Sequence, residues 1–279
     1  TGRRHQRSIG TPRNLVQAKR YYESACSQKD ENSCTEIGYM HETGWDGFVE
    51  INLNEARKAY ETGCGRGSGF ACEQLGRLYE SGKLGLYTSR PYATAAGLYL
   101  DACRRNRPGA CSSLGNLHRL GLGVDQDQVR ARQLFEKSCG INKKYCYDIG
   151  KLYLRGRGVD RSYTKVKEYY DPACRAGEGR ACGELGQLYH HAVGVGRNYE
   201  LAADLYSKGC GLDDATSCNE LAGLYKKGRG VDKNPEQAAD LFLKACELLT
   251  GPSSFTACNN LGLAYRDGSG VAANGEKAV

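Results

Sequence analysis

The chain has 279 residues and a net charge of +7, which results from 39 basic and 32 acidic residues. Because the two signs are interspersed along most of the chain, an ordinary mixed surface is favoured over a nucleic-acid-binding one. No segment reaches the run of about 18 apolar residues that a membrane-spanning helix needs. Hydrophobic residues make up 40%, with 19 Tyr but only one Met and one Trp. A core of small and aromatic side chains is typical of closely packed helical repeats.

The N-terminal segment differs in charge from the rest of the chain. Residues 1–13 contain Arg3, Arg4, Arg7 and Arg13 and no acidic residue. We predict a basic, flexible tail over these residues. The sequence begins without Met, which is consistent with a mature or trimmed product whose export or import signal has been removed.

Fourteen cysteines dominate the remaining sequence and form seven successive pairs. Five pairs have a sequence separation of eight, and the step from one pair to the next is 35 to 39 residues. A regular step of this length indicates a repeat protein. The pairs are Cys26 and Cys34, Cys64 and Cys72, Cys103 and Cys111, Cys139 and Cys146, Cys174 and Cys182, Cys210 and Cys218, and Cys246 and Cys258.

Each cysteine pair is flanked by two helical patterns. Eight residues before the first cysteine stands Ala or Val, and four residues before it stands an aromatic residue, so both lie on one face of a helix A. Three residues after the second cysteine stands Ile or Leu, followed by Gly or Ala, which predicts a helix B in close contact with another helix. In six units helix B is expected to end at a glycine.

Residues 14–279 are therefore predicted to form an all-α solenoid of seven helix-turn-helix repeats. We expect the repeats at about 14–50, 51–90, 91–126, 127–162, 163–198, 199–234 and 235–273, with the start of an eighth at 274–279. Longer connections at 45–53 and 83–92 and an insertion at 250–255 interrupt the period. Such insertions map to loops, where partner contacts often lie.

The cysteine pairs are predicted to be disulfides that join the end of helix A to the start of helix B. A tight turn between two helices brings the Cα atoms within the about 4.4–6.8 Å that a disulfide requires. A structural zinc ion needs four ligands at one point, whereas stacked repeats place equivalent cysteines about 10 Å apart. The sequence also has no CxxC motif. Zinc binding and free thiols remain the less favoured alternatives.

The segment from Cys218 to Val231 contains the run Leu-Ala-Gly-Leu-Tyr-Lys-Lys-Gly-Arg-Gly-Val, and matching segments end at Val124, Val159 and Val271. These segments resemble the Sel1-like repeat (SLR), a relative of the tetratricopeptide repeat. The cysteine pair in every unit resembles the Helicobacter cysteine-rich proteins of that family. The resemblance implies a right-handed α/α superhelix with a concave surface. It also implies an adaptor for proteins or peptides and, for the cysteine-rich branch, secretion and penicillin binding or weak β-lactamase activity.

Polar side chains six residues before the first cysteine form a candidate binding row, because they lie opposite the Ala and aromatic stripe of helix A. Stacked repeats align equivalent positions, so the row is predicted to change from basic to acidic along the solenoid and to bind a charged, extended partner. A solvated helix face without a ligand is the alternative. The row consists of Arg20, Lys58, Gln133, Glu168, Asp204 and Asp240.

Histidines and catalytic motifs give no further site. His41 and His118 stand where other repeats have Tyr, so we expect half-buried aromatic substitutes with one hydrogen bond. His190 and His191 are adjacent and should point about 100° apart on a helix, which disfavours a shared metal ion. The motifs GxSxG and HExxH are absent, and every cysteine has a pairing partner. We therefore predict no catalytic residue, no metal site and no cofactor.

The sequence thus predicts a protein-interaction scaffold in an oxidising compartment, either the secreted or periplasmic space or the mitochondrial intermembrane space. Its partners are expected to be proteins or peptides, bound on the helix A surface and the insertion loops. The resemblance leaves two alternatives. One is a penicillin-binding or weak β-lactamase-type enzyme, and the other is a structural or assembly subunit of a mitochondrial complex.

Overall fold

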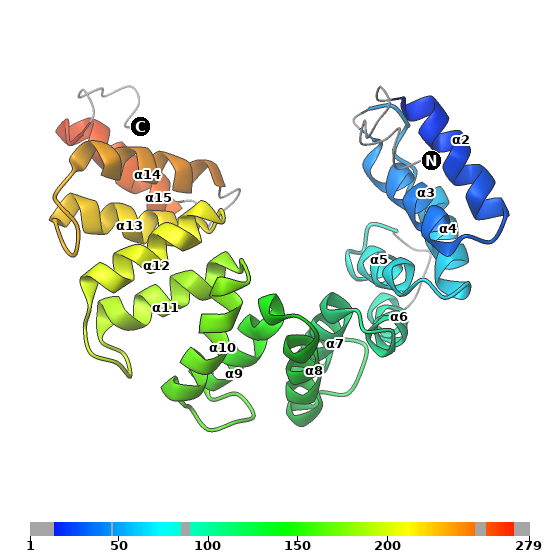
Figure 1. The fold of residues 1–279 in the computed structure, drawn as a ribbon, viewed down its shortest axis with the longest axis horizontal. Coiled ribbons are helices and arrows are strands. Elements are labelled where there is room, and N and C mark those ends of the chain that lie inside the picture. Colours follow the sequence, from blue (N-terminus) through cyan, green and yellow to red (C-terminus); the bar gives the residue numbers. More distant parts are fainter. Residues whose placement is uncertain (1–13, 46, 85–89, 249–254, 271–279) are drawn as a thin grey trace. The chain divides into compact units, whose positions relative to one another are not determined.

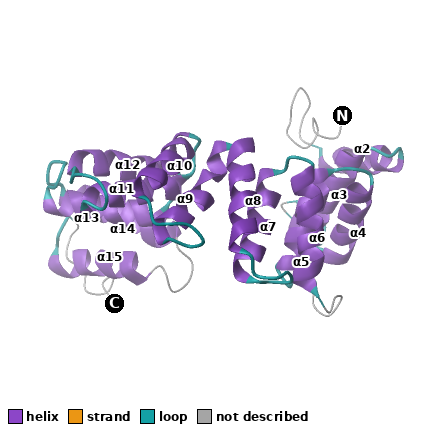
Figure 2. Cartoon of the chain, turned by 90° about the horizontal axis from the view of Figure 1, so that it is seen from below, coloured by secondary structure: helices purple, strands orange, loops and turns teal. Residues whose placement is uncertain are grey.

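The computed structural model describes residues 14–45, 47–84, 90–248 and 255–270. All regular secondary structure in these ranges is helical (Figure 2). The expected tail at 1–13 and the expected eighth repeat at 274–279 lie outside the described residues, as do parts of the three insertions. The chain divides into two compact units, residues 1–141 and 142–279.

The helices follow one another in chain order within each unit, and each packs on the helix before it (Figure 1). The first unit contains α2 (Leu15–Ser27), α3 (Glu31–Thr43), α4 (Leu53–Gly65), α5 (Gly69–Glu80), α6 (Pro91–Arg104), α7 (Pro108–Leu120) and α8 (Gln128–Ile141). The second contains the 3-10 helix η2 (Lys143–Tyr145), α9 (Cys146–Arg155), α10 (Tyr163–Arg175), α11 (Gly179–His191), α12 (Tyr199–Gly211), α13 (Ala215–Lys227), α14 (Pro235–Leu248) and α15 (Phe255–Asp267). Even-numbered helices are the A helices, and odd-numbered helices are the B helices.

Local sequence sets where these helices begin and end. Asn52 and Asn198 accept hydrogen bonds from backbone N–H groups of the first turns of α4 and α12, and Asp214 does the same for α13. Helix α13 ends at Gly228 in the left-handed conformation, as expected for a C-terminal glycine. Ala192, which replaces this glycine after α11, also has a left-handed φ of 59°.

Disulfides join the two helices of the hairpins. The structure shows Cys26–Cys34, Cys64–Cys72, Cys103–Cys111, Cys174–Cys182, Cys210–Cys218 and Cys246–Cys258 bonds, with Cα–Cα distances between 4.6 and 4.9 Å. Cys139 and Cys146 are disulfide-bonded as well, and no described cysteine is free. The predicted fold class, an all-α solenoid of disulfide-clipped hairpins, is confirmed.

The core lies mainly between repeats. Most B helices pack more extensively on the A helix of the next repeat than on the A helix of their own hairpin. The small residue of helix B permits this contact, because a Cβ at Gly38 would lie 2.5 Å from the Tyr60 ring and one at Gly186 would lie 2.7 Å from the Tyr206 ring. Both tyrosines are completely buried. In these repeats the aromatic residue of helix A thus fills the space that a missing side chain leaves in the preceding repeat.

A buried tyrosine ring also brings a hydroxyl that needs a hydrogen-bond partner. The hydroxyl of Tyr60 donates to Glu42 at 2.7 Å, and that of Tyr99 donates to Glu80 at 2.5 Å. Each glutamate stands eight residues after the second cysteine of the preceding repeat. Tyr206 lies 3.2 Å from Nδ1 of His190, which occupies the same position in its repeat. A polar side chain at this position therefore lies beside the hydroxyl of the next buried tyrosine in three places along the chain.

The remaining repeats show what happens when the partner position changes. Where it holds Arg119 or Lys226, which have no acceptor atom on the side chain, the next aromatic residue is Phe135 or Phe242 and has no hydroxyl. Where it holds Leu154, the next aromatic residue is Tyr170. The Tyr170 hydroxyl is buried and has no hydrogen-bond partner among the described residues.

We expect Gly186→Ala to lower the free energy of unfolding by about 1–3 kcal/mol, because the added methyl group overlaps the Tyr206 ring. Gly223→Ala is the matched control, since a Cβ there meets no atom within 4 Å. It should raise the free energy of unfolding by up to about 1 kcal/mol through helix propensity. Urea unfolding of the oxidised proteins, followed by circular dichroism, measures both changes. Equal effects at the two glycines would contradict the proposed role of the ring contact.

We expect Tyr60→Phe to lower the free energy of unfolding by about 1–2 kcal/mol, because Glu42 loses its hydrogen-bond donor. Tyr170→Phe should have no effect or a small stabilising one, since it removes a buried hydroxyl without a partner. The same urea experiment compares the two variants. A greater loss from Tyr170→Phe than from Tyr60→Phe would be the contrary result.

Candidate functional site

All six residues of the predicted binding row are exposed on A helices. The first unit carries Arg20 in α2, Lys58 in α4 and Gln133 in α8. The second unit carries Glu168 in α10, Asp204 in α12 and Asp240 in α14. The part of the row in the first unit is basic or neutral, whereas the part in the second unit is entirely acidic.

Neighbours in the same helix neutralise some members of this row. Lys58 donates to Glu55 at 2.8 Å, and this hydrogen bond lowers the pKa of Glu55. Lys165 donates to Glu168 at 2.6 Å. Asp204 and Asp240 form no ion pair within the part of the chain that the structure describes, so their charges are available to a partner.

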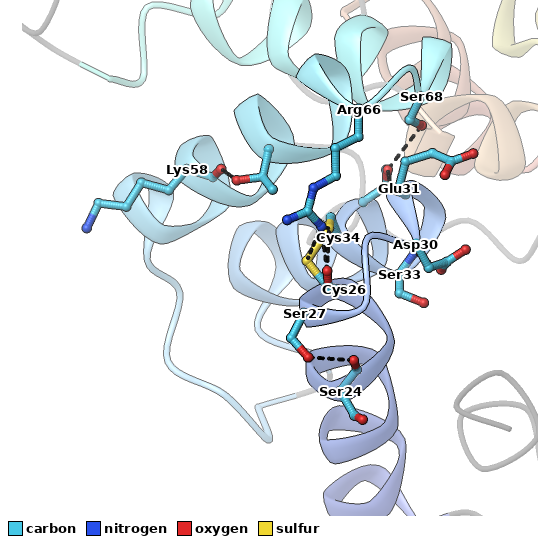
Figure 3. The surroundings of a disulfide bond; sticks show 12 residues. Ser24, Cys26, Ser27, Asp30, Glu31, Ser33, Cys34, Lys58, Arg66 and Ser68 are labelled. Carbon is cyan, nitrogen blue, oxygen red and sulfur yellow. Dashed lines mark hydrogen bonds between the residues drawn. A yellow bond between two sulfur atoms is a disulfide. The ribbon is translucent and has the colours of Figure 1, made fainter.

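The disulfide edge of the hairpins is covered by basic residues of the following repeat. Figure 3 shows the Arg66 guanidinium beside the Cys26–Cys34 disulfide, where it donates to the Cys26 carbonyl and lies 3.1 Å from Sγ of Cys34. Lys244 likewise donates to the Cys210 carbonyl at 2.8 Å. Cations at the carboxyl end of a helix are favoured by the helix dipole. The disulfide edge therefore contributes to the stability of the fold. In most pairs the second cysteine is completely buried.

Sequence reasoning missed a polar groove of about 370 Å³ in the second unit. It lies where the A-to-B turns of consecutive repeats meet, so no single repeat contains it. The available sequence signal was the presence of charged residues such as Glu178, Arg180 and Asp213 in the turns between paired cysteines. Its lining residues include Lys144, Glu178, Arg180, Leu212, Asp213 and Leu248.

Trp45, at the start of the first insertion loop, is part of the hydrophobic core. Trp45 is 5% exposed and packs with Ala18, Tyr22 and Met40. Its ring meets the Tyr22 ring edge-on at 5.9 Å. Leu84, at the start of the second insertion, is also buried. These residues anchor the ends of both loops to their own repeats.

The histidines agree only in part with the sequence interpretation. His118 is half-buried, with Nδ1 3.4 Å from the Asp125 carbonyl oxygen, as expected of an aromatic substitute. His41 is also half-buried, but its Nδ1 has no hydrogen-bond partner among the described residues. Burial and then the charge of Lys19 lower the pKa of His41.

The expectation that His190 and His191 point apart is wrong. Their rings stack face to face with centroids 4.4 Å apart and an interplanar angle of 9°. The angle of about 100° applies to Cα–Cβ directions, and the side-chain torsions bring the rings back together at the end of α11. Glu220 of α13 lies beside them, with Oε2 3.8 Å from Nδ1 of His190. Burial lowers the pKa of His190, and neighbouring cations act in the same direction.

Comparison with protein families identifies the repeat. Seven segments match the Sel1 repeat model, at residues 1–30, 32–67, 108–140, 144–178, 179–214, 215–248 and 256–279. The chain belongs to the Sel1 repeat family. Several of the matched segments begin near a B helix and end after the next A helix, which is the pair of helices that packs most extensively. The disulfides instead join A to B within one hairpin.

Solved structures support the same fold. A Sel1 repeat protein from Oxalobacter formigenes has a TM-score of 0.72 at 26% identity, with 85% of this chain and 96% of that protein covered. A protective antigen of uropathogenic Escherichia coli strains, which displays an SLR fold, has a TM-score of 0.67 at 23% identity. That match covers 99% of this chain, which spans 65% of the antigen's length.

The Helicobacter pylori cysteine rich protein B is 32% identical over 49% of this chain and 96% of its own, with a TM-score of 0.40. No curated protein sequence matches the chain. The predicted resemblance to SLR proteins is confirmed.

Two general conclusions follow from the family and the disulfides. Sel1 repeat proteins generally act as scaffolds for protein interactions. Disulfides persist in oxidising compartments, so the chain belongs to such a compartment. None of the described helices is both long and apolar enough to cross a membrane.

We expect the first unit to lose stability as the pH falls below about 6.5, because His41 is less basic when folded than in the unfolded chain. The unfolded chain then binds a proton more readily than the folded chain, which favours unfolding until both forms are protonated. Glu23 and Glu55 oppose this shift but do not reverse it. His41→Tyr introduces the residue found in other repeats and should reduce the loss, as thermal unfolding between pH 5 and 8 would show. An identical pH profile for both proteins would exclude His41 as the source.

Proposed function

We propose that this chain is a scaffold that holds a charged, extended protein or peptide partner on its A helices. The observation that carries the proposal is the exposure of all six row residues at equivalent positions of six A helices, three in each unit. Within each unit, the repeat spacing fixes the distance between neighbouring members of the row, so the surface favours a partner with charges at a matching spacing.

The second unit carries the part of this surface whose charges are best placed to bind a partner. Asp204 and Asp240 are exposed and lack ion-pair partners in the described ranges, whereas Lys58 of the first unit is paired with Glu55. Unpaired charges attract an approaching partner of opposite sign more strongly than paired ones. We infer that the second unit binds a basic segment.

The proposed place of action is outside the reducing cytosol. The secreted and periplasmic spaces and the mitochondrial intermembrane space all share the oxidising chemistry that the disulfides require. Fractionation of the source cells, with the redox state of the cysteines measured in each fraction, tests this assignment.

We expect the double variant Asp204→Lys plus Asp240→Lys to lose affinity for basic partners. Peptides selected on the wild-type chain from a displayed random library should be enriched in Lys and Arg. Their affinity for the double variant should fall by at least about ten-fold, or about 1.4 kcal/mol. Calorimetry with synthetic copies of the selected peptides measures the difference.

The control carries the same change in net charge at another place. Asp160→Lys plus Asp232→Lys alters two exposed aspartates in the loops after α9 and α13. This variant should keep at least half of the wild-type affinity. An equal loss in both double variants would mean that net charge alone attracts the peptides, and no loss in either would remove the row as a binding site.

A further inference from the structure

Two histidines at the end of α11 and a glutamate in α13 bring their metal-binding atoms together in the second unit. The ligand atoms of His190, His191 and Glu220 all lie within 4.8 Å of one another. Nδ1 of His190 is 3.8 Å from Oε2 of Glu220, and the two imidazole rings are stacked. Helices α11 and α13 pack on each other, so the fold itself sets this convergence.

We propose that His190, His191 and Glu220 bind a divalent transition-metal ion of the zinc class. Two imidazoles and one carboxylate form a ligand set that suits Zn²⁺, and water completes the coordination. Metal–ligand distances of about 2.0–2.2 Å place the ligand atoms of a tetrahedral ion about 3.3 Å apart. The ligand atoms therefore need to approach one another by about 1 to 1.5 Å relative to the widest separation found here.

The side chains are free to make this adjustment. The nitrogen lone pairs of two parallel rings do not converge, so His191 must rotate out of its stack with His190, and its exposure leaves room for this rotation. The Glu220 side chain is 30% exposed and can move as well. His190 is the anchored member, with a side chain only 14% exposed. The rings of Tyr199 and Tyr206 pack edge-on against its imidazole. One fixed ligand and two adjustable ones reduce the ordering that metal binding requires.

Nearby positive charge opposes the ion but does not exclude it. Arg197, Lys227 and Arg229 act electrostatically on His190. All three are exposed, so water and salt screen their charges. The cations weaken binding without occupying the site, and removing one of them should strengthen it.

The cysteines do not compete for the ion. Zinc binds thiolates, whereas every cysteine of this chain is disulfide-bonded. The ion would also connect two consecutive repeats, because α11 and α13 belong to neighbouring hairpins that no disulfide joins. Each disulfide links two helices of one hairpin, and the metal would link one repeat to the next.

The experiment uses the oxidised, metal-free full chain. Calorimetric titration with Zn²⁺ and visible absorption with Co²⁺ should show one ion per chain, and Zn²⁺ should raise the melting temperature. His191→Ala and Glu220→Gln should each weaken Zn²⁺ binding by at least about ten-fold. Lys227→Gln, which removes a like charge, should tighten it.

His118→Ala is the matched control, because it removes an imidazole from the first unit and should leave Zn²⁺ binding unchanged. His191 and Glu220 are not buried, so these variants should keep the wild-type circular dichroism spectrum. The proposal is overturned if the wild-type chain binds no Zn²⁺, or if His191→Ala and Glu220→Gln bind it as tightly as wild type. Peptide binding by the acidic row is measured separately and without metal, so the two proposals fail independently.

Discussion

The contact between an aromatic ring of one repeat and a glycine of the preceding repeat sets the spacing of the helices. Tyr60 lies on Gly38 and Tyr206 lies on Gly186, at distances that leave no room for a Cβ. Both rings are completely buried, and their hydroxyls have partners inside the protein, Glu42 for Tyr60 and His190 for Tyr206. The repeat with Ala222 instead of glycine is followed by Phe242, which has no hydroxyl to satisfy.

The disulfides reinforce the part of the structure that packing holds less strongly. Helices A and B of one hairpin share a smaller contact than helix B and the next helix A. A disulfide across such a short loop contributes about 2.5 kcal/mol in the chain-entropy model. The sulfur atoms are also part of the core, since Cys72, Cys103 and Cys111 pack in one cluster with Ala102 and Ala110. Covalent bonds within hairpins and ring contacts between hairpins thus act on different helix pairs.

The cysteine period and the position of the small residues were sufficient to predict the fold. Both are local signals, because each repeat contains its own pair and its own glycine. The sites that were missed combine residues from several repeats. Glu220 meets His190 only after α11 and α13 pack, and the groove near Arg180 needs turns from successive repeats. Side-chain torsions decided the His190–His191 contact, and one-dimensional spacing carries no information about them.

A helix held on both sides presents its exposed face in a fixed position. Asp204 lies on α12. Cys210 of this helix is bonded to Cys218 of α13, and its Tyr206 ring packs on Gly186 of α11. A partner that binds this face therefore loses its own conformational entropy, whereas the scaffold loses little. The same argument explains why selectivity would lie in the spacing and sign of the exposed charges. A rigid surface cannot adapt to a partner whose charges are placed differently, so such a partner is rejected by unpaired or like charges.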